Sequence, residues 1–186
     1  GDEDDYFQSS LFTIARRRIL WLLILVLANG LTTKVIAMND QILKEIVLLA
    51  AFIPLLIGTG GNVGAQSSTV VIRGLSTQKL KSLGAIKAVV KEAITGALLG
   101  VLMMLVVFPF AWWQGEGTLI ASAVGISLIS ITTLAATTGA ILPLLFDRMK
   151  LDPALMSSPF ITTVTDIAGV FIYLSTAKWL LSSSLV

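Results

Sequence analysis

The chain has 186 residues, of which 55% are hydrophobic and only 13% charged, and its mean hydropathy is +0.91. Soluble domains carry charges on about a quarter of their residues, so this composition predicts an integral membrane protein. Cysteine and histidine are both absent from the sequence, which excludes disulfides, thiolate or imidazole metal sites and nucleophile–imidazole pairs. We attribute the net charge of +2 to loop topology and expect no nucleic-acid partner.

Five apolar stretches are long enough to cross a bilayer, which takes about 20 residues per helix. We expect an all-α bundle of five transmembrane helices over residues 19–186, preceded by a cytoplasmic segment, residues 1–18. The predicted spans are Ile19–Met38, Ile46–Ile72, Ala93–Trp113, Thr118–Phe146 and Pro159–Ala177. The second and fourth spans are long, which indicates tilt or interruption. Pro54 and the Gly58–Gly64 cluster mark where we expect the second span to break.

The basic residues predict the orientation of the chain. Ten of the 13 Lys and Arg residues precede the first span or lie around the connections after the second and fourth, and three lie on the other side. By the positive-inside rule, we expect a cytoplasmic N-terminus and an outside C-terminus in a multi-pass protein of the cell membrane. The acidic start differs from a signal peptide, and Asp5–Arg18 is expected to be a short amphipathic helix leading into the bilayer.

The second span contains glycines and small polar residues. Gly60 and Gly61 allow another backbone or a ligand to approach closely. Amide and hydroxyl groups offer uncharged oxygen to a cation or to water. Ordinary small-residue helix packing is the alternative, but the amides favour a pore-lining surface. Helical spacing aligns four polar side chains in one stripe: Asn62, Gln66, Thr69 and Arg73.

Asp166 is the single acidic residue within any long apolar stretch. Ionisable residues inside membranes are costly and mark ion or substrate pathways. The alternatives are a structural hydrogen bond between helices or a protonated carboxyl group. Ser157 and Ser158 lie just before an expected break at Pro159. Helical spacing defines one face of the fifth span: Thr162, Asp166, Gly169 and Tyr173.

The remaining intramembrane polar groups receive structural interpretations. Glu92, at the start of the third span, is interpreted as a surface charge, with a secondary cation site as the alternative. Asp166 without a second carboxylate, His or Cys offers no acid–base set, so we expect no enzyme. Packing or hydrogen bonding to the preceding turn is expected for four threonines of the fourth span: Thr132, Thr133, Thr137 and Thr138.

Two separated stretches resemble the MgtE-type magnesium transporters. The first is Pro54–Leu75, which reads PLLIGTGGNVGAQSSTVVIRGL. The second is Leu151–Phe160, which reads LDPALMSSPF and is followed by Thr163 and Asp166-Ile167-Ala168-Gly169. The basic segment Ala15–Arg18 before Trp21 is similar too. The resemblance covers essentially the whole chain, with the same order of five spans.

The resemblance implies a homodimer with a cation pore along its two-fold axis, lined by the second and fifth helices. It implies that Asp166 holds a hydrated Mg²⁺, with Mn²⁺ or Ca²⁺ as other candidate ions. It also implies that many members carry cytoplasmic sensor domains. This sequence contains no such domain. The candidate pore-lining residues are Gly60, Gly61, Asn62, Gln66, Ser158, Thr162, Thr163 and Gly169.

The chain departs from the family pattern at two positions. Members commonly carry asparagine where this chain has Ala65, and many carry it where this chain has Ser158. Fewer amides around a hydrated ion favour weaker discrimination among Mg²⁺, Mn²⁺ and Ca²⁺. Because related eukaryotic carriers are proposed Na⁺-coupled exchangers, a Na⁺-coupled Mg²⁺ exchanger is one alternative. A non-transporting membrane subunit is the alternative from another class.

The charge asymmetry predicts that the connections near Ser76 and Gly117 lie on opposite sides of the membrane. Cysteines introduced singly at these positions into the Cys-free chain should react with a membrane-impermeant maleimide from opposite sides. Labelling of both cysteines from the same side would rule out the five-span order.

Overall fold

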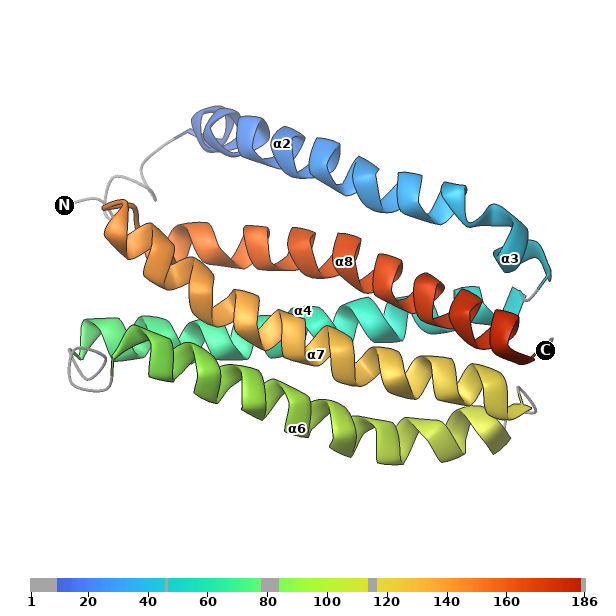
Figure 1. Ribbon diagram of the computed structural model, residues 1–186. Coiled ribbons are helices and arrows are strands. Elements are labelled where there is room, and N and C mark those ends of the chain that lie inside the picture. The colour runs from blue at the N-terminus through green and yellow to red at the C-terminus, as the bar shows by residue number, and fades with distance from the viewer. Residues whose placement is uncertain (1–9, 46, 78–83, 114–116, 185–186) are drawn as a thin grey trace.

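The computed structural model describes residues 10–45, 47–77, 84–113 and 117–184, and these contain helices and turns but no strand. Among these residues, five long helices run the length of the bundle and alternate in direction (Figure 1). The predicted all-α class is confirmed. In chain order the helices are α2 (Leu11–Met38), α3 (Asp40–Glu45), α4 (Val47–Ser76), α6 (Ala85–Ala111), α7 (Gly117–Arg148) and α8 (Pro153–Ser184).

Four helices among the described residues are long and apolar enough to cross a membrane: Val47–Ser76, Ala85–Ala111, Gly117–Arg148 and Ser157–Ser182. The chain is therefore a multi-pass membrane protein. In α2 the apolar part is shorter and covers Leu22–Met38. At 1.5 Å per residue this part is about 26 Å long, against about 30 Å for the hydrocarbon core. The predicted count of five spans thus stays a prediction, because it requires that α2 also cross the membrane.

The N-terminal segment differs from its prediction. The short amphipathic helix expected over Asp5–Arg18 falls partly on residues 5–9, outside the described residues. From Leu11 onward, the segment belongs to α2, which continues without a break to Met38. Ser10 caps this helix, because its hydroxyl accepts a hydrogen bond from the backbone N–H of Thr13 at 3.3 Å.

Helix α7 is the centre of the bundle. It packs against α4, α6 and α8, whereas α2 packs against α8 at the margin (Figure 1). Apolar side chains from α4, α7 and α8 meet in one core, and burial of such surface stabilises the packed helices against one another. The largest fully buried members of this core are Leu49, Leu56, Leu128, Ile131, Tyr173 and Leu174.

Glycines bring the backbones of neighbouring helices together. A β-carbon on Gly139 of α7 would overlap the carbonyl oxygen of Gly64 in α4. On the other side of α7, a β-carbon on Gly96 of α6 would lie 2.5 Å from the carbonyl oxygen of Thr132. Small residues at such crossings permit the close van der Waals packing that holds membrane helices together.

The predicted interruptions of the second and fifth spans are wrong. Helix α4 continues through Pro54 and the Gly58–Gly64 cluster, and α8 begins at Pro153 and continues through Pro159. The glycines of α4 serve close packing rather than a break. A proline inside a membrane helix is tolerated because neighbouring groups can satisfy the freed backbone carbonyls. Pro153 takes the first helical position, where its missing N–H would have no helical partner.

The close contact between α4 and α7 predicts what a side chain added at Gly139 would do. Gly139→Ala should lower the thermal stability of the detergent-solubilised protein, because overpacking costs about 1–3 kcal/mol and exceeds the gain in helix propensity. Gly30→Ala is the matched control, since a β-carbon on Gly30 meets nothing within 4 Å. Thermal loss of the helical circular dichroism signal provides the measurement. Equal midpoints for the Gly139→Ala and native proteins would contradict the packing role.

Candidate functional site

The polar stripe of the second span lies on an uncovered face of α4. Among the described residues, nothing covers the exposed side chains of Asn62 and Gln66. The opposite side of α4, including Gly64 and Ser67, is buried. The predicted stripe is therefore confirmed, and an apolar position that the sequence interpretation missed, Val70, belongs to the same face. The face lines an open groove of about 740 Å³, formed by Asn62, Ala65, Gln66, Thr69, Val70 and Arg73.

Asp166 lies half-buried on α8. Within the described residues, its carboxylate takes part in no hydrogen bond or ion pair. Nearby hydroxyl groups donate to the backbone instead: Thr162 Oγ1 donates to the carbonyl oxygen of Pro159 at 2.9 Å, and Thr165 Oγ1 donates to that of Ile161 at 2.8 Å. In the described part of the chain, Asp166 therefore has no partner for the structural hydrogen bond between helices that was the alternative interpretation.

Helices α4 and α8 lie side by side where their polar residues occur. A β-carbon on Gly61 would lie 4.0 Å from Thr162 Cγ2, and one on Gly60 would lie 3.7 Å from Thr165 Cβ. Asn62 follows these glycines in α4, and Asp166 lies one helical turn after Thr162 in α8. The contact therefore brings the beginning of the α4 stripe close to the α8 segment that carries Asp166, although the two are about 100 residues apart in the sequence.

The open part of the α8 face is shorter than predicted. Ser158, Thr162 and Asp166 recur every four residues and share one side of the helix. Ser158 and Thr162 are exposed, and Thr163 beside them is half-buried. One turn beyond Asp166 the face enters the core at the buried Gly169, and two turns beyond it Tyr173 is fully buried. Only the N-terminal half of the predicted face is open to the surroundings of the chain.

Two of the predicted pore-lining glycines face α7 in the single chain. A β-carbon on Gly60 would lie 2.8 Å from Ile131 Cγ2, and one on Gly169 would lie 3.7 Å from Ile131 Cδ1. Both glycines therefore support packing around the candidate site. Their participation in a pore stays a prediction, as does that of the other candidates.

Three of the four threonines named in α7 form intrahelical hydrogen bonds, as expected, whereas Thr138 is half-buried. Three hydroxyl groups donate to the carbonyl four residues earlier, at 2.8 Å for Thr132, 2.6 Å for Thr133 and 2.7 Å for Thr137. Glu92 is half-buried on α6, and α7 lies between α6 and α8 (Figure 1). A secondary cation site at Glu92 thus stays an alternative, and the structure does not bring it to Asp166.

The atoms of this face that could bind a cation are oxygen atoms. They belong to the Asp166 carboxylate, to the amides of Asn62 and Gln66 and to nearby hydroxyl groups. Such donors suit hard cations such as Mg²⁺, Ca²⁺ and Mn²⁺. The described residues contain no cluster of three or more Asp, Glu, Cys or His side chains that could enclose a metal ion. Within the described residues, the oxygen atoms of this face are thus not accompanied by a cage of carboxylates.

Comparison with known proteins identifies the family. The family model MgtE, described as a divalent cation transporter, matches residues 53–176, a segment that contains both polar regions. The chain belongs to the MgtE family. The matched residues run from α4 through α8, and the family description is that of a transporter, not of an enzyme.

Proteins of this family from three bacteria resemble most of the chain, and each is called magnesium transporter MgtE. The protein of Thermus thermophilus is 38% identical over 166 residues, covering 89% of this chain and 37% of that protein. The protein of Bacillus subtilis is 33% identical over 94% of this chain and 39% of its own length. The protein of Enterococcus faecalis is 33% identical over 88% of this chain and 36% of its own length. The chain thus spans a little over a third of the length of these relatives.

Proposed function

We propose that this chain forms the membrane pore of a divalent-cation transporter and that Mg²⁺ is the transported ion. The observation that carries the proposal is the uncovered polar face of α4, which adjoins the contact between Gly61 of α4 and Thr162 of α8, one turn before the half-buried Asp166. The names of the relatives support the choice of ion. Two copies related by a two-fold axis, with these faces turned toward each other, enclose a hydrated path.

The cost of exposing the polar face of α4 to lipid supports the two-fold arrangement. Asn62 and Gln66 lie in a membrane-spanning helix, and lipid chains offer their amides no hydrogen-bond partner. Facing a second copy across water removes these groups from lipid and leaves the path wet. The same arrangement places two copies of Asp166 on one path, although each chain contributes a single Asp166.

Charge supports a divalent cation at this level. Two carboxylates that face each other repel in a medium of low dielectric constant. A divalent cation between them balances both charges and is the largest local charge in such a site. A monovalent ion would leave one negative charge uncompensated. We therefore assign the central ion position to Asp166 from both copies.

The donor set supports a hydrated ion. Mg²⁺ requires nearly octahedral ligands at about 2.0–2.1 Å and loses its water reluctantly. The described residues contain no cage of carboxylates that could replace these waters. Asp166 then accepts hydrogen bonds from waters of the ion, and the oxygen atoms of Asn62 and Thr162 orient further waters.

The same proposal includes the direction of the chain. The beginning of α2, the end of α4 and the end of α7 lie at one end of the bundle (Figure 1). Basic residues occur at each of these positions, among them Arg16, Arg73 and Arg148. By the positive-inside rule this end is cytoplasmic, so the path connects the outside of the cell membrane with the cytoplasm.

Asp166→Asn tests the central position, because it keeps the size of the side chain and removes its charge. Mg²⁺ flux into proteoliposomes should fall by about 10–100-fold, the usual effect of losing a group that holds a metal through its outer shell. Asp147→Asn, which removes an exposed carboxylate at the end of α7, should transport normally. Flux is measured with a Mg²⁺-sensitive dye and with Na⁺ equal on both sides. Normal transport by Asp166→Asn would refute the assignment.

Gly61→Leu tests whether the path follows the contact between α4 and α8. A leucine at this position extends past Thr162, and flux should fall at least about tenfold while the protein elutes at its native size. Gly61→Ala should retain flux, since its β-carbon would sit in ordinary contact at 4.0 Å from Thr162 Cγ2. Full activity of Gly61→Leu would place this stretch in ordinary helix packing and outside the path.

A further inference from the structure

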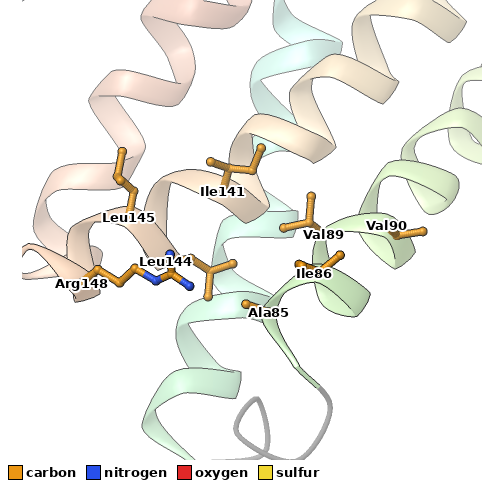
Figure 2. Close-up of a pocket in the computed structure, with 8 residues that line it drawn as sticks. All are labelled: Ala85, Ile86, Val89, Val90, Ile141, Leu144, Leu145 and Arg148. Atoms are coloured by element: carbon orange, nitrogen blue, oxygen red, sulfur yellow. The ribbon is translucent and has the colours of Figure 1, made fainter.

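We propose that the start of α6 and the end of α7 bind an anionic phospholipid. Two adjoining grooves make up this site, which we call the lipid groove. The first, of about 270 Å³, lies between α6 and α7 and is lined by Ala85, Ile86, Val89, Val90, Ile141, Leu144, Leu145 and Arg148 (Figure 2). The second, of about 360 Å³, lies along α6 and is lined by Ile86, Lys87, Val90, Lys91, Ile94 and Thr95.

The geometry fits a ligand with two apolar chains. Both grooves share Ile86 and Val90, so they meet on one side of α6 and diverge from it. Ile86 is 81% exposed and Val90 is 51% exposed, which leaves the junction open in the single chain. One phospholipid molecule has two acyl chains joined at one headgroup, and each groove can receive one of them.

The charges distinguish this surface from ordinary lipid contact. Arg148 lies in the last turn of α7, and its side chain extends beside Leu144 in the first groove (Figure 2). Lys87 and Lys91 line the second groove one turn apart. Among the described residues the ion pair found is between Lys44 and Asp40, so these three cations have no acidic partner there. The nearby carboxylates Glu92 and Asp147 line neither groove.

This combination of apolar walls and cations favours an anionic headgroup. A guanidinium binds phosphate through two parallel hydrogen bonds, and lysine adds a compact positive charge. Basic pockets between membrane helices recognise anionic lipid headgroups in this way. A zwitterionic lipid carries the same phosphate, but its own ammonium group offsets the attraction of the lysines. We therefore expect phosphatidylglycerol to bind more tightly than phosphatidylcholine.

Native mass spectrometry of the full chain in detergent, titrated with either lipid, tests the proposal. Phosphatidylglycerol should bind with at least about tenfold lower Kd than phosphatidylcholine, the scale expected when basic residues attract a headgroup of net negative charge. Arg148→Gln should weaken phosphatidylglycerol binding at least about tenfold, because it removes the paired hydrogen bonds to phosphate, and the double variant Lys87→Gln, Lys91→Gln should abolish most of the preference. Lys150→Gln is the matched control, because Lys150 lies two residues away and lines neither groove, and it should keep the preference.

A second variant tests the apolar part separately. Val90→Trp fills the junction of the two grooves from an exposed position on α6 and should weaken phosphatidylglycerol binding with all three cations intact. Circular dichroism and elution volume establish that each variant folds. Equal binding of both lipids by the native chain, or equal losses in Arg148→Gln and Lys150→Gln, would overturn the proposal and indicate only general surface attraction. Unchanged binding by Val90→Trp would overturn it as well.

Discussion

The close approach of α4 and α7 at Gly64 and Gly139 is the contact on which the arrangement of the site depends. At this point two backbones meet with no side chain between them, and the contact fixes the rotation of α4 about its axis. Residues two positions apart on an α-helix lie on roughly opposite sides, because 3.6 residues complete a turn. With Gly60 and Gly64 turned toward α7, Asn62 and Gln66 are turned away from the bundle. The polar face is thus exposed because the glycine face is buried.

The same contact leaves the polar face of α4 open within the described residues. Asp166 of α8 lies at the level where α8 meets the glycines of α4, and the hydroxyl groups around it bond to their own helix. Nothing in the described residues compensates the carboxylate, and lipid cannot do so. A site that lacks partners on its open side is physically consistent only with water, an ion or a second protein surface at that side. In a membrane, an uncovered polar face of this kind therefore supports the proposed two-fold assembly.

The basic residues at one end of the bundle support two of the proposals. Lys and Arg near the ends of spans set the orientation of the chain during insertion. Arg148, Lys87 and Lys91 also border apolar grooves that open toward lipid, where anionic headgroups are their natural counterions. The lipid groove lies on α6 and α7, away from the exposed face of α4. The proposed lipid groove, on α6 and α7, and the proposed ion path, along α4 and α8, thus lie on different surfaces of the bundle.

The sequence by itself determined the membrane class, the approximate spans, the polar stripe at Asn62 and Gln66 and the singular position of Asp166. Each follows from local chemistry, since hydropathy, helical spacing and an isolated charge are readable along the chain. Only the tertiary structure decided that Pro54 and the glycine cluster lie within one continuous helix. It also decided that the face of Asp166 enters the core at Gly169, and that α6 and α7 leave apolar grooves beside Arg148. A glycine can either break a helix or receive another backbone, and a side chain two turns along a face can be open or covered. Which of these occurs depends on where the neighbouring helix lies, and that position is set by contacts between residues far apart in the chain.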